Sequence, residues 1–319
     1  MKIWRDAEQL HPQVPASILA IGVFDGLHRG HQQIIQEVRK IAGEWSVAAG
    51  VVTFDPHPAV VLAPERAPRQ LATPGQRLEG FAALGLDVAR VIRFDEEQSR
   101  ESARSFIERV LVGELGVKGV VVGEDFRFGH NREGDVQLLR EEGERLGFDV
   151  LASPIHGSST RWSSTEVRRV LTEGNIDLAN EILGRPFTLR GVVQHGDARG
   201  RDLGYPTANL GCTPRQQIPG IGIYAGATRL PNGEWWPGAI SIGTRPQFYE
   251  NGELLVEVHI PGFKGDLYDE ELNVAFLSRL RGEMKFDGLP ELVAQIDRDT
   301  NKSLEIFRNF SPSTSILLG

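Results

Sequence analysis

Short apolar runs and amphipathic stretches alternate along the first half of the chain. The runs that predict strands are residues 17–23, 46–54, 88–94, 118–122 and 149–153. The stretches that predict helices are residues 31–41, 74–84, 102–115 and 135–146. Strands that are apolar throughout and separated by helices are typical of a parallel sheet covered on both faces. We therefore expect a doubly wound α/β domain, which binds ligands beyond the carboxyl ends of its strands.

The pattern changes near residue 184. Two short helices, residues 164–171 and 176–183, are predicted just before it. The strand-like segments after it are residues 188–194, 223–230, 234–242, 254–260 and 272–280. Many short strands without intervening helices indicate a small antiparallel β-barrel, and residues 289–307 predict a C-terminal helix that packs on it. We therefore expect two domains, residues 1–184 and 185–319.

The composition is that of an ordinary globular protein. Of the 319 residues, 40% are hydrophobic and 24% are charged, and the formal net charge is -8. This acidic balance argues against a broad nucleic-acid-binding face, which needs a basic surface. It leaves room for a local cationic site that binds phosphates.

The cysteine content and the N-terminal segment indicate the compartment. Cys212 is the single cysteine, so no intrachain disulfide can form, and a reducing compartment fits best. The first 20 residues lack the apolar core of a signal peptide, and no stretch is apolar for the length of a membrane helix. We expect a cytoplasmic protein without nucleic-acid or membrane partners, and weak self-association is left open.

A glycine-rich segment leaves the first of these strands and enters a helix. Glycines at such a turn let the backbone approach a phosphate, and the N–H groups at a helix start favour anions. His28 and His31 stand three residues apart, so both can face one side of the first turn and hydrogen-bond a triphosphate. A strand-to-helix turn with incidental histidines is the alternative. The candidate ATP-binding residues are Gly22, Phe24, Asp25, Gly26, His28, Gly30 and His31.

The string HxGH in this setting resembles the signature of the nucleotidylyltransferase superfamily, whose Rossmann-like members join a phosphate to the α-phosphate of a nucleoside triphosphate. The second signature of that superfamily, SSTxxR, is similar to residues 163–168. Hydroxyls, helix-start amides and a guanidinium suit the β- and γ-phosphates of a pyrophosphate leaving group. An ordinary helix cap beside a surface arginine is the alternative. The candidates here are Arg161, Ser164, Thr165 and Arg168.

Two further strings come at the ends of predicted strands, where the ligand-binding edge of the sheet is expected. They are TFDPHP at residues 53–58 and GEDFRFG at residues 123–129. Both are similar to strings of the bacterial FAD synthetases, and the resemblance implies that they line FMN and ATP pockets. Aromatic packing beneath loops is the alternative for the phenylalanines. The resemblance assigns Asp125 to ATP and assigns to the flavin Phe54, Pro56, His57, Pro58, Phe126, Arg127 and Phe128.

The second half carries its own phosphate-binding pattern. A glycine- and arginine-rich loop follows a predicted strand and leads into the string PTAN. Thr207 and Asn209 alternate on this extended segment, so both side chains project from one face, and their oxygens suit Mg²⁺. A polar hairpin rim is the alternative, but the run resembles the flavokinase module of the same bacterial enzymes. The candidate ATP-binding residues are Gly196, Asp197, Arg199, Gly200, Arg201, Tyr205, Pro206, Thr207 and Asn209.

Glu257 is the candidate catalytic carboxylate of the second domain. It lies on a predicted strand with alternating neighbours, where a lone charged residue usually faces solvent. It matches the catalytic glutamate of the flavokinase family. Two positions depart from that family: Ser241 stands where asparagine is expected, and Asp269 stands where glycine is expected.

Together the resemblances imply a bifunctional riboflavin kinase/FAD synthetase. The second domain would phosphorylate riboflavin to FMN with ATP and Mg²⁺, aided by Glu257. The first would transfer an adenylyl group from ATP to FMN, giving FAD and pyrophosphate, with charge stabilisation by His28, His31 and Arg168. Riboflavin, FMN, FAD and ATP would be its small-molecule partners. The alternatives are a nucleotidylyltransferase for another phosphate, such as phosphopantetheine or glycerol phosphate, and a flavin sensor without catalysis.

Overall fold

The computed structural model describes residues 1–5, 16–153, 162–196, 204–244 and 254–312. The chain divides into two compact units. The first comprises Met1–Pro68 and Pro74–Arg161, and the second comprises Arg69–Thr73 and Trp162–Leu318. The helices predicted just before residue 184 lie in the second unit, and the functional boundary at residue 184 stays a prediction.

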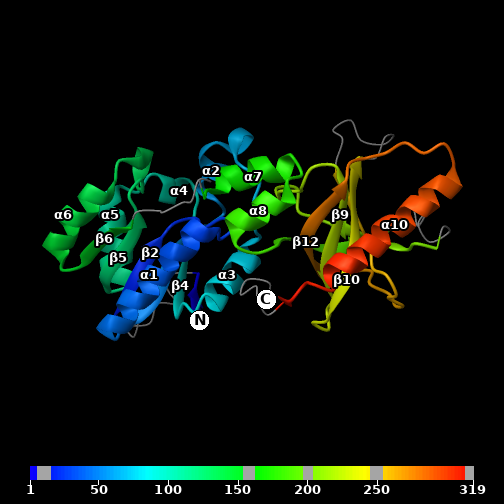
Figure 1. The fold of residues 1–319 in the computed structure, drawn as a ribbon. Coiled ribbons are helices and arrows are strands. Elements are labelled where there is room, and N and C mark those ends of the chain that lie inside the picture. The colour runs from blue at the N-terminus through cyan, green and yellow to red at the C-terminus, as the bar shows by residue number, and fades with distance from the viewer. Residues whose placement is uncertain (6–15, 154–161, 197–203, 245–253, 313–319) are drawn as a thin grey trace. The chain divides into compact units, whose positions relative to one another are not determined.

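The first unit is built on a six-stranded parallel sheet with the order β1-β4-β3-β2-β5-β6 (Figure 1). This confirms the predicted fold class. Its strands are β1 (Lys2–Trp4), β2 (Ser17–Ile21), β3 (Ala48–Asp55), β4 (Val88–Arg93), β5 (Val117–Gly123) and β6 (Asp149–Ser153). The chain runs outward from β2 through β3 to β4 and in the opposite direction from β5 to β6. The strand order therefore reverses between β2 and β5, where such folds bind ligands.

Helices cover both faces of this sheet. They are α1 (Arg29–Trp45), α2 (Pro58–Leu62), α3 (Pro74–Ala83), α4 (Glu96–Ser99), α5 (Ala103–Phe106) and α6 (Val136–Leu146), with short turns η2 (Pro64–Arg66) and η4 (His130–Arg132). Helix α1 buries Ile34, Ile35, Val38 and Ile41, a helical spacing, against β2, β3 and β5. The single helix predicted at residues 102–115 is instead α5 followed by the π-helix η3 (Ile107–Glu114).

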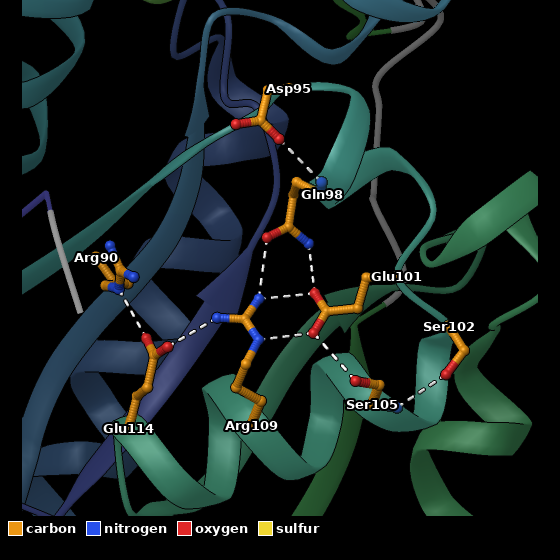
Figure 2. A network of polar contacts seen from close by, with 8 residues as sticks. All are labelled: Arg90, Asp95, Gln98, Glu101, Ser102, Ser105, Arg109 and Glu114. Atoms are coloured by element: carbon orange, nitrogen blue, oxygen red, sulfur yellow. Dashed lines mark hydrogen bonds and ion pairs between the residues drawn. The ribbon is translucent and has the colours of Figure 1, made fainter.

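A polar network, here called the Arg109 cluster, ties α4 and η3 to β4 (Figure 2). The Arg109 guanidinium donates to both carboxylate oxygens of Glu101, each at 2.7 Å, and to Glu114 at 2.8 Å. Arg90 on β4 donates to the other oxygen of Glu114 at 2.9 Å. Both carboxylates are only 11% exposed, so their charges need these partners.

The second unit contains a closed antiparallel barrel with the order β10-β11-β8-β7-β12-β9. Its strands are β7 (Phe187–Gln194), β8 (Thr207–Gly211), β9 (Gly222–Arg229), β10 (Trp235–Thr244), β11 (Leu254–His259) and β12 (Glu271–Arg281). Helix α10 (Leu289–Phe307) packs on β9, β10 and β12, which confirms the predicted barrel and C-terminal helix (Figure 1). Strand β7 alternates buried and more exposed positions, as the pattern of a barrel wall requires.

The core of the second unit draws on distant parts of the chain. Helices α7 (Ser164–Thr172) and α8 (Ile176–Leu183) share one apolar cluster with the barrel strands. Leu71, from the short segment Arg69–Thr73, belongs to the same cluster and is 2% exposed. Gln70 anchors this segment: its N–H donates to the Arg215 carbonyl at 2.6 Å, and its carbonyl accepts from the Gln217 N–H at 2.8 Å. Among the described residues, no helix has the length and apolar character needed to cross a bilayer.

Candidate active sites

Three of the predicted strings of the first unit meet at one edge of the sheet. The glycine-histidine segment follows β2, TFDPHP covers the end of β3, and GEDFRFG follows β5. Because β3, β2 and β5 are hydrogen-bonded neighbours and all parallel, their carboxyl ends lie side by side. The structure therefore brings these strings together at the point where the strand order reverses, as the sequence predicted.

The two histidines of the first string form one stacked pair. His28 is the N-cap residue of α1 and is 4% exposed, and its ring lies 3.6 Å from that of His31, centroid to centroid. In the described residues, His31 Nδ1 is buried without a hydrogen-bond partner. Burial lowers the pKa of His31 well below its usual range, and His28 lowers it further. A neutral imidazole at a helix start is suited to hydrogen-bond an anionic ligand.

The backbone of this string is tightly turned. Gly26 has φ 79°, which glycine adopts without strain, and Gly22 lies against the Phe24 ring, which a Cβ there would meet at 3.2 Å. Gly30 is buried in the first turn of α1. Asp25 is 4% exposed, so this predicted ATP-binding carboxylate faces protein rather than bulk solvent.

The predicted flavin residues divide into core and surface groups. Phe128 is 8% exposed and stacks on Phe126 with ring centroids 5.4 Å apart, so it packs in the core beneath the loop. Phe54 is half-buried and contacts Phe94 edge to face at 5.8 Å. Asp125 and Arg127 are exposed, and the Arg127 Nη1 lies 3.9 Å from Asp135.

The FDPHP turn leads directly into a helix. His57 caps α2, with its Nδ1 accepting a hydrogen bond from the Ala59 N–H at 3.1 Å. Pro58 occupies the first turn of α2, a position that proline favours. Pro56, His57 and Pro58 are all half-buried, so each keeps part of its surface open to a ligand.

The SSTxxR motif starts helix α7, as predicted, and belongs to the second compact unit. The cap itself is Ser163, whose Oγ accepts from the Glu166 N–H at 3.2 Å, and Ser164 and Thr165 form the first helical turn. Arg168 Nε donates to the Arg69 carbonyl at 2.6 Å. The joint action of this motif with the two histidines stays a prediction, and Arg161 lies outside the described residues.

The barrel gathers the predicted kinase residues on neighbouring strands. The register of β8 and β11 places Asn209 opposite Glu257 and Thr207 opposite His259. Thr207 Oγ1 donates to Glu257 Oε1 at 3.3 Å. The barrel interior takes the alternating residues Val256 and Val258, so Glu257 stands half-buried on the outer face with the other two. A hydroxyl, an amide and a carboxylate thus converge.

Gly196 and residues 205–206, which flank this cluster, contact other parts of the second unit. A Cβ at Gly196 would lie 2.1 Å from Asn209 Nδ2, so a larger residue here would displace the Asn209 amide. The Tyr205 hydroxyl donates to Asp297 on α10, and the Pro206 carbonyl lies 2.8 Å from His259 Nδ1. The predicted loop residues Asp197, Arg199, Gly200 and Arg201 lie outside the described residues.

Comparison with known proteins matches each half of the chain to a family. The models for FAD synthetase and riboflavin kinase match residues 11–166 and 183–307. A bifunctional riboflavin kinase/FMN adenylyltransferase from Pseudomonas fluorescens is 39% identical over 300 residues, covering 94% of this chain and 96% of its own. One of the same name from Escherichia coli is 37% identical over 316 residues, covering 98% and 100%. The chain belongs to this family.

A solved structure supports the fold of this family member. A crystal structure from Streptococcus pneumoniae, described as a macrolide-efflux protein, has a TM-score of 0.83 with the chain. It is 28% identical, and the match covers 97% of this chain and 99% of that one. Family membership rests on the sequence relatives, and this structure adds evidence for the architecture.

The structure shows where the two departures from the flavokinase pattern, Ser241 and Asp269, lie. Asp269 has φ 63°, a left-handed conformation that is consistent with the expected glycine, and aspartate tolerates it better than most side chains. Ser241 pairs with Glu257 in the register of β10 and β11, so it lies directly beside the candidate catalytic carboxylate. The serine thus places a small hydroxyl at a position where the resemblance to the flavokinase family leads us to expect an amide.

The structure also contains a pocket that the sequence did not predict. A pocket beside Thr207 has an apolar lining that includes Val258, Phe263 and Leu267. Tyr268 also lines it and stacks on His195 with ring centroids 4.0 Å apart. The signal was weak, because Phe263, Leu267 and Tyr268 come from the glycine-containing segment between β11 and β12, whose apolar side chains show no strand or helix period.

Proposed function

We propose that this family member phosphorylates riboflavin to FMN and then adenylylates FMN to FAD. The observation that carries the proposal is the similarity to bifunctional riboflavin kinase/FMN adenylyltransferases over more than nine-tenths of both chains, in both modules at once. A nucleotidylyltransferase for another phosphate would have no use for the riboflavin kinase module. A sensor would have no use for the retained His28, His31 and Glu257.

In the second unit, the terminal hydroxyl of riboflavin attacks the γ-phosphorus of ATP. The new O–P bond forms while the bond to ADP breaks, and Glu257 accepts the hydroxyl proton. The hydrogen bond from Thr207 holds the carboxylate in place. The apolar pocket beside Thr207 accommodates the adenine ring, which an apolar and aromatic lining suits.

A magnesium ion fits the oxygen atoms of this cluster. Thr207 and Asn209 project from the same face of β8 toward Glu257, and hydroxyl and amide oxygens are ligands suited to Mg²⁺ together with substrate phosphates and waters. When bound, the ion neutralises negative charge on the transferred phosphoryl group. We assign Thr207 and Asn209 to hold it.

In the first unit, a phosphate oxygen of FMN attacks the α-phosphorus of a second ATP. The bond to the β-phosphate breaks, and pyrophosphate leaves. The FMN phosphate is already ionised, so no strong base is needed, and catalysis comes from positioning and charge stabilisation. We assign this work to His28, His31 and the helix-start amides of α1, with Ser164, Thr165 and Arg168 on the leaving pyrophosphate.

Product chromatography tests the proposal. The purified chain is incubated with Mg-ATP and either riboflavin or FMN, and FMN, FAD, ADP and pyrophosphate are followed over time. We expect FMN and ADP first, then FAD and pyrophosphate. His28→Ala should abolish FAD formation and spare FMN formation, whereas Glu257→Ala should block FMN formation and spare FAD formation from supplied FMN. Loss of both activities from either variant in a folded protein would contradict this division.

The remaining expectations rest on the sequence. We propose a cytoplasmic location, because the single cysteine, Cys212, allows no intrachain disulfide and fits a reducing compartment. Burial raises the pKa of this thiol to about 12, so it stays protonated and poorly reactive at neutral pH. Weak self-association stays open and is tested by sedimentation at several protein concentrations.

A further inference from the structure

Helix α3 places a buried arginine beneath two of the loops at the sheet edge. Arg77 is 5% exposed, although arginine is among the residues most rarely buried. Its Nη1 donates to the Val23 carbonyl at 2.8 Å, in the loop after β2. Its Nη2 donates to the Phe54 carbonyl at 3.2 Å, at the end of β3. One guanidinium therefore joins residues 22–27 after β2, here called the ATP loop, to residues 54–58 at the end of β3 and just after it, here called the flavin loop. Both belong to the proposed adenylyltransferase site.

The Thr53 hydroxyl adds to the contact between Arg77 and the Val23 carbonyl. Thr53 Oγ1 donates to the Val23 carbonyl at 3.2 Å and accepts from Arg77 Nη1 at 3.4 Å. The Val23 carbonyl thus accepts two hydrogen bonds from one direction. A backbone oxygen held in this way has little freedom to shift relative to the end of β3.

Charge explains how the guanidinium tolerates burial. Burial lowers the pKa of Arg77, and the carboxylates of Asp25 and Asp55 act in the opposite direction. Arg5 lies 3.7 Å from Asp55 and also faces this group, where its charge lowers the pKa of Arg77 further. A buried cation without such partners would cost several kcal/mol. Asp25 belongs to the ATP loop and Asp55 to the flavin loop, so the charges also link the two loops through Arg77.

Helix α3 holds the ATP loop at a second point. Phe81 lies one turn after Arg77 on the same face of the helix, and its ring meets that of Phe24 edge to face at 5.6 Å. Phe24 has φ 54°, a left-handed conformation that costs a bulky residue on the order of 1–3 kcal/mol. Such a conformation persists only where the surroundings hold it. Arg77 thus hydrogen-bonds Val23, and Phe81 packs against the next residue, Phe24.

We propose that Arg77 is a positioning residue for adenylyl transfer. It fixes the ATP loop against the flavin loop, so that the α-phosphorus and the attacking FMN phosphate are brought to reacting distance. The inference rests on the proposed function of this sheet edge. It requires the two-nitrogen fork of arginine, because the single ammonium nitrogen of a lysine keeps the charge but cannot occupy the positions of both Nη1 and Nη2, which bond the carbonyls of Val23 and Phe54.

The test is the single-turnover rate of FAD formation at saturating ATP and FMN. This first-order rate constant does not depend on how many molecules are folded, so a purely structural defect leaves it unchanged. We expect Arg77→Lys and Arg77→Met each to lower it by about 10- to 100-fold, since a misplacement of about 1 Å costs about that much. Riboflavin kinase activity of the same samples should stay at the wild-type level.

Arg90→Lys is the matched control. Arg90 is also a buried arginine of the first unit, at 4% exposure, and donates to the backbone carbonyls of Arg5 and Val91, but it bonds neither loop carbonyl. Its variant should lower thermal stability without slowing the single turnover. A wild-type rate constant in Arg77→Lys, with only lower amplitude or melting temperature, would overturn the proposal. A wild-type chain that forms no FAD would instead refute the proposed function itself.

Discussion

The Arg109 cluster offers a measurable test of how the first unit is held together. Replacing Arg109 by methionine keeps an unbranched apolar stem and removes the guanidinium (Figure 2). Glu114 keeps a cationic partner, because Arg90 donates to it at 2.9 Å. Among the side chains of the described residues, Glu101 then keeps only the neutral donors Gln98 and Ser105. The substitution therefore leaves one largely buried carboxylate without its cation.

The exposure of the two side chains sets the size of the expected loss in stability. Breaking a fully buried ion pair costs about 3–5 kcal/mol, whereas an exposed pair contributes about 0–1 kcal/mol. Glu101 is 11% exposed and Arg109 is 42% exposed, so the pair lies between these limits. We expect Arg109→Met to lower the free energy of unfolding by about 2 kcal/mol at pH 7, or the melting temperature by roughly 4–8 °C.

The stability that the Glu101–Arg109 pair contributes should depend on pH. Burial raises the pKa of Glu101, but the hydrogen bonds from Arg109 and Gln98 lower it more, so the folded pKa lies below the usual value. The resulting stability is present above the unfolded pKa of about 4.3 and is lost as the pH falls through the folded pKa. Urea unfolding followed by circular dichroism should therefore show the two proteins converging below about pH 4.3.

A double-mutant cycle with Glu101→Gln is the control, and adding Arg109→Met to that variant should cost little more. A difference between wild type and Arg109→Met that stays constant from pH 7 to about pH 3.5 would refute the assignment of the effect to Glu101. So would a difference below about 0.5 kcal/mol at pH 7, which is the range of an ordinary surface substitution.

Three further predictions concern the second unit. Glu257→Gln should lower the turnover of riboflavin phosphorylation by about 10²- to 10⁴-fold in product chromatography, and an unchanged rate would remove Glu257 from catalysis. Asn209→Ala should raise the Mg²⁺ concentration for half-maximal kinase activity by about tenfold, as the loss of one polar contact to an ion implies; an unchanged metal titration would exclude it as a ligand. Phe276 is fully buried and contacts the rings of Phe187 and Tyr224, so Phe276→Ala should lower the free energy of unfolding by about 3–5 kcal/mol. A decrease below about 1 kcal/mol in urea unfolding would argue against that packing.

Most elements were predictable because their signals are local. The periodic pattern placed α8 and α10 at their observed bounds, and the apolar runs located β2 through β6 to within a few residues. Strand β1 was missed because its three residues are too few to carry a pattern. The π-helix η3 was missed because Ile107, Val110 and Leu111 have the same spacing that an α-helix would show.

The candidate sites were predictable only in part, because contacts across strands need a register. Alternation put Thr207 and Asn209 on one face, but only the pairing of β8 with β11 places them beside Glu257. Arg77 carried no signal, because a lone arginine in a helical stretch normally faces solvent. The grouping of α7 with the barrel was likewise hidden, since its apolar face gives no indication of which surface it covers.

The position of Leu71 has a consequence for synthesis on the ribosome. Its partners in the apolar cluster include Val167 and Phe276, so the last of them emerges roughly 200 residues after Leu71 itself. At about 5–20 residues per second, this leucine waits on the order of 10–40 s before its binding partners exist. During that interval the first unit can complete its sheet, while Leu71 has not yet met the residues that bury it in the second unit.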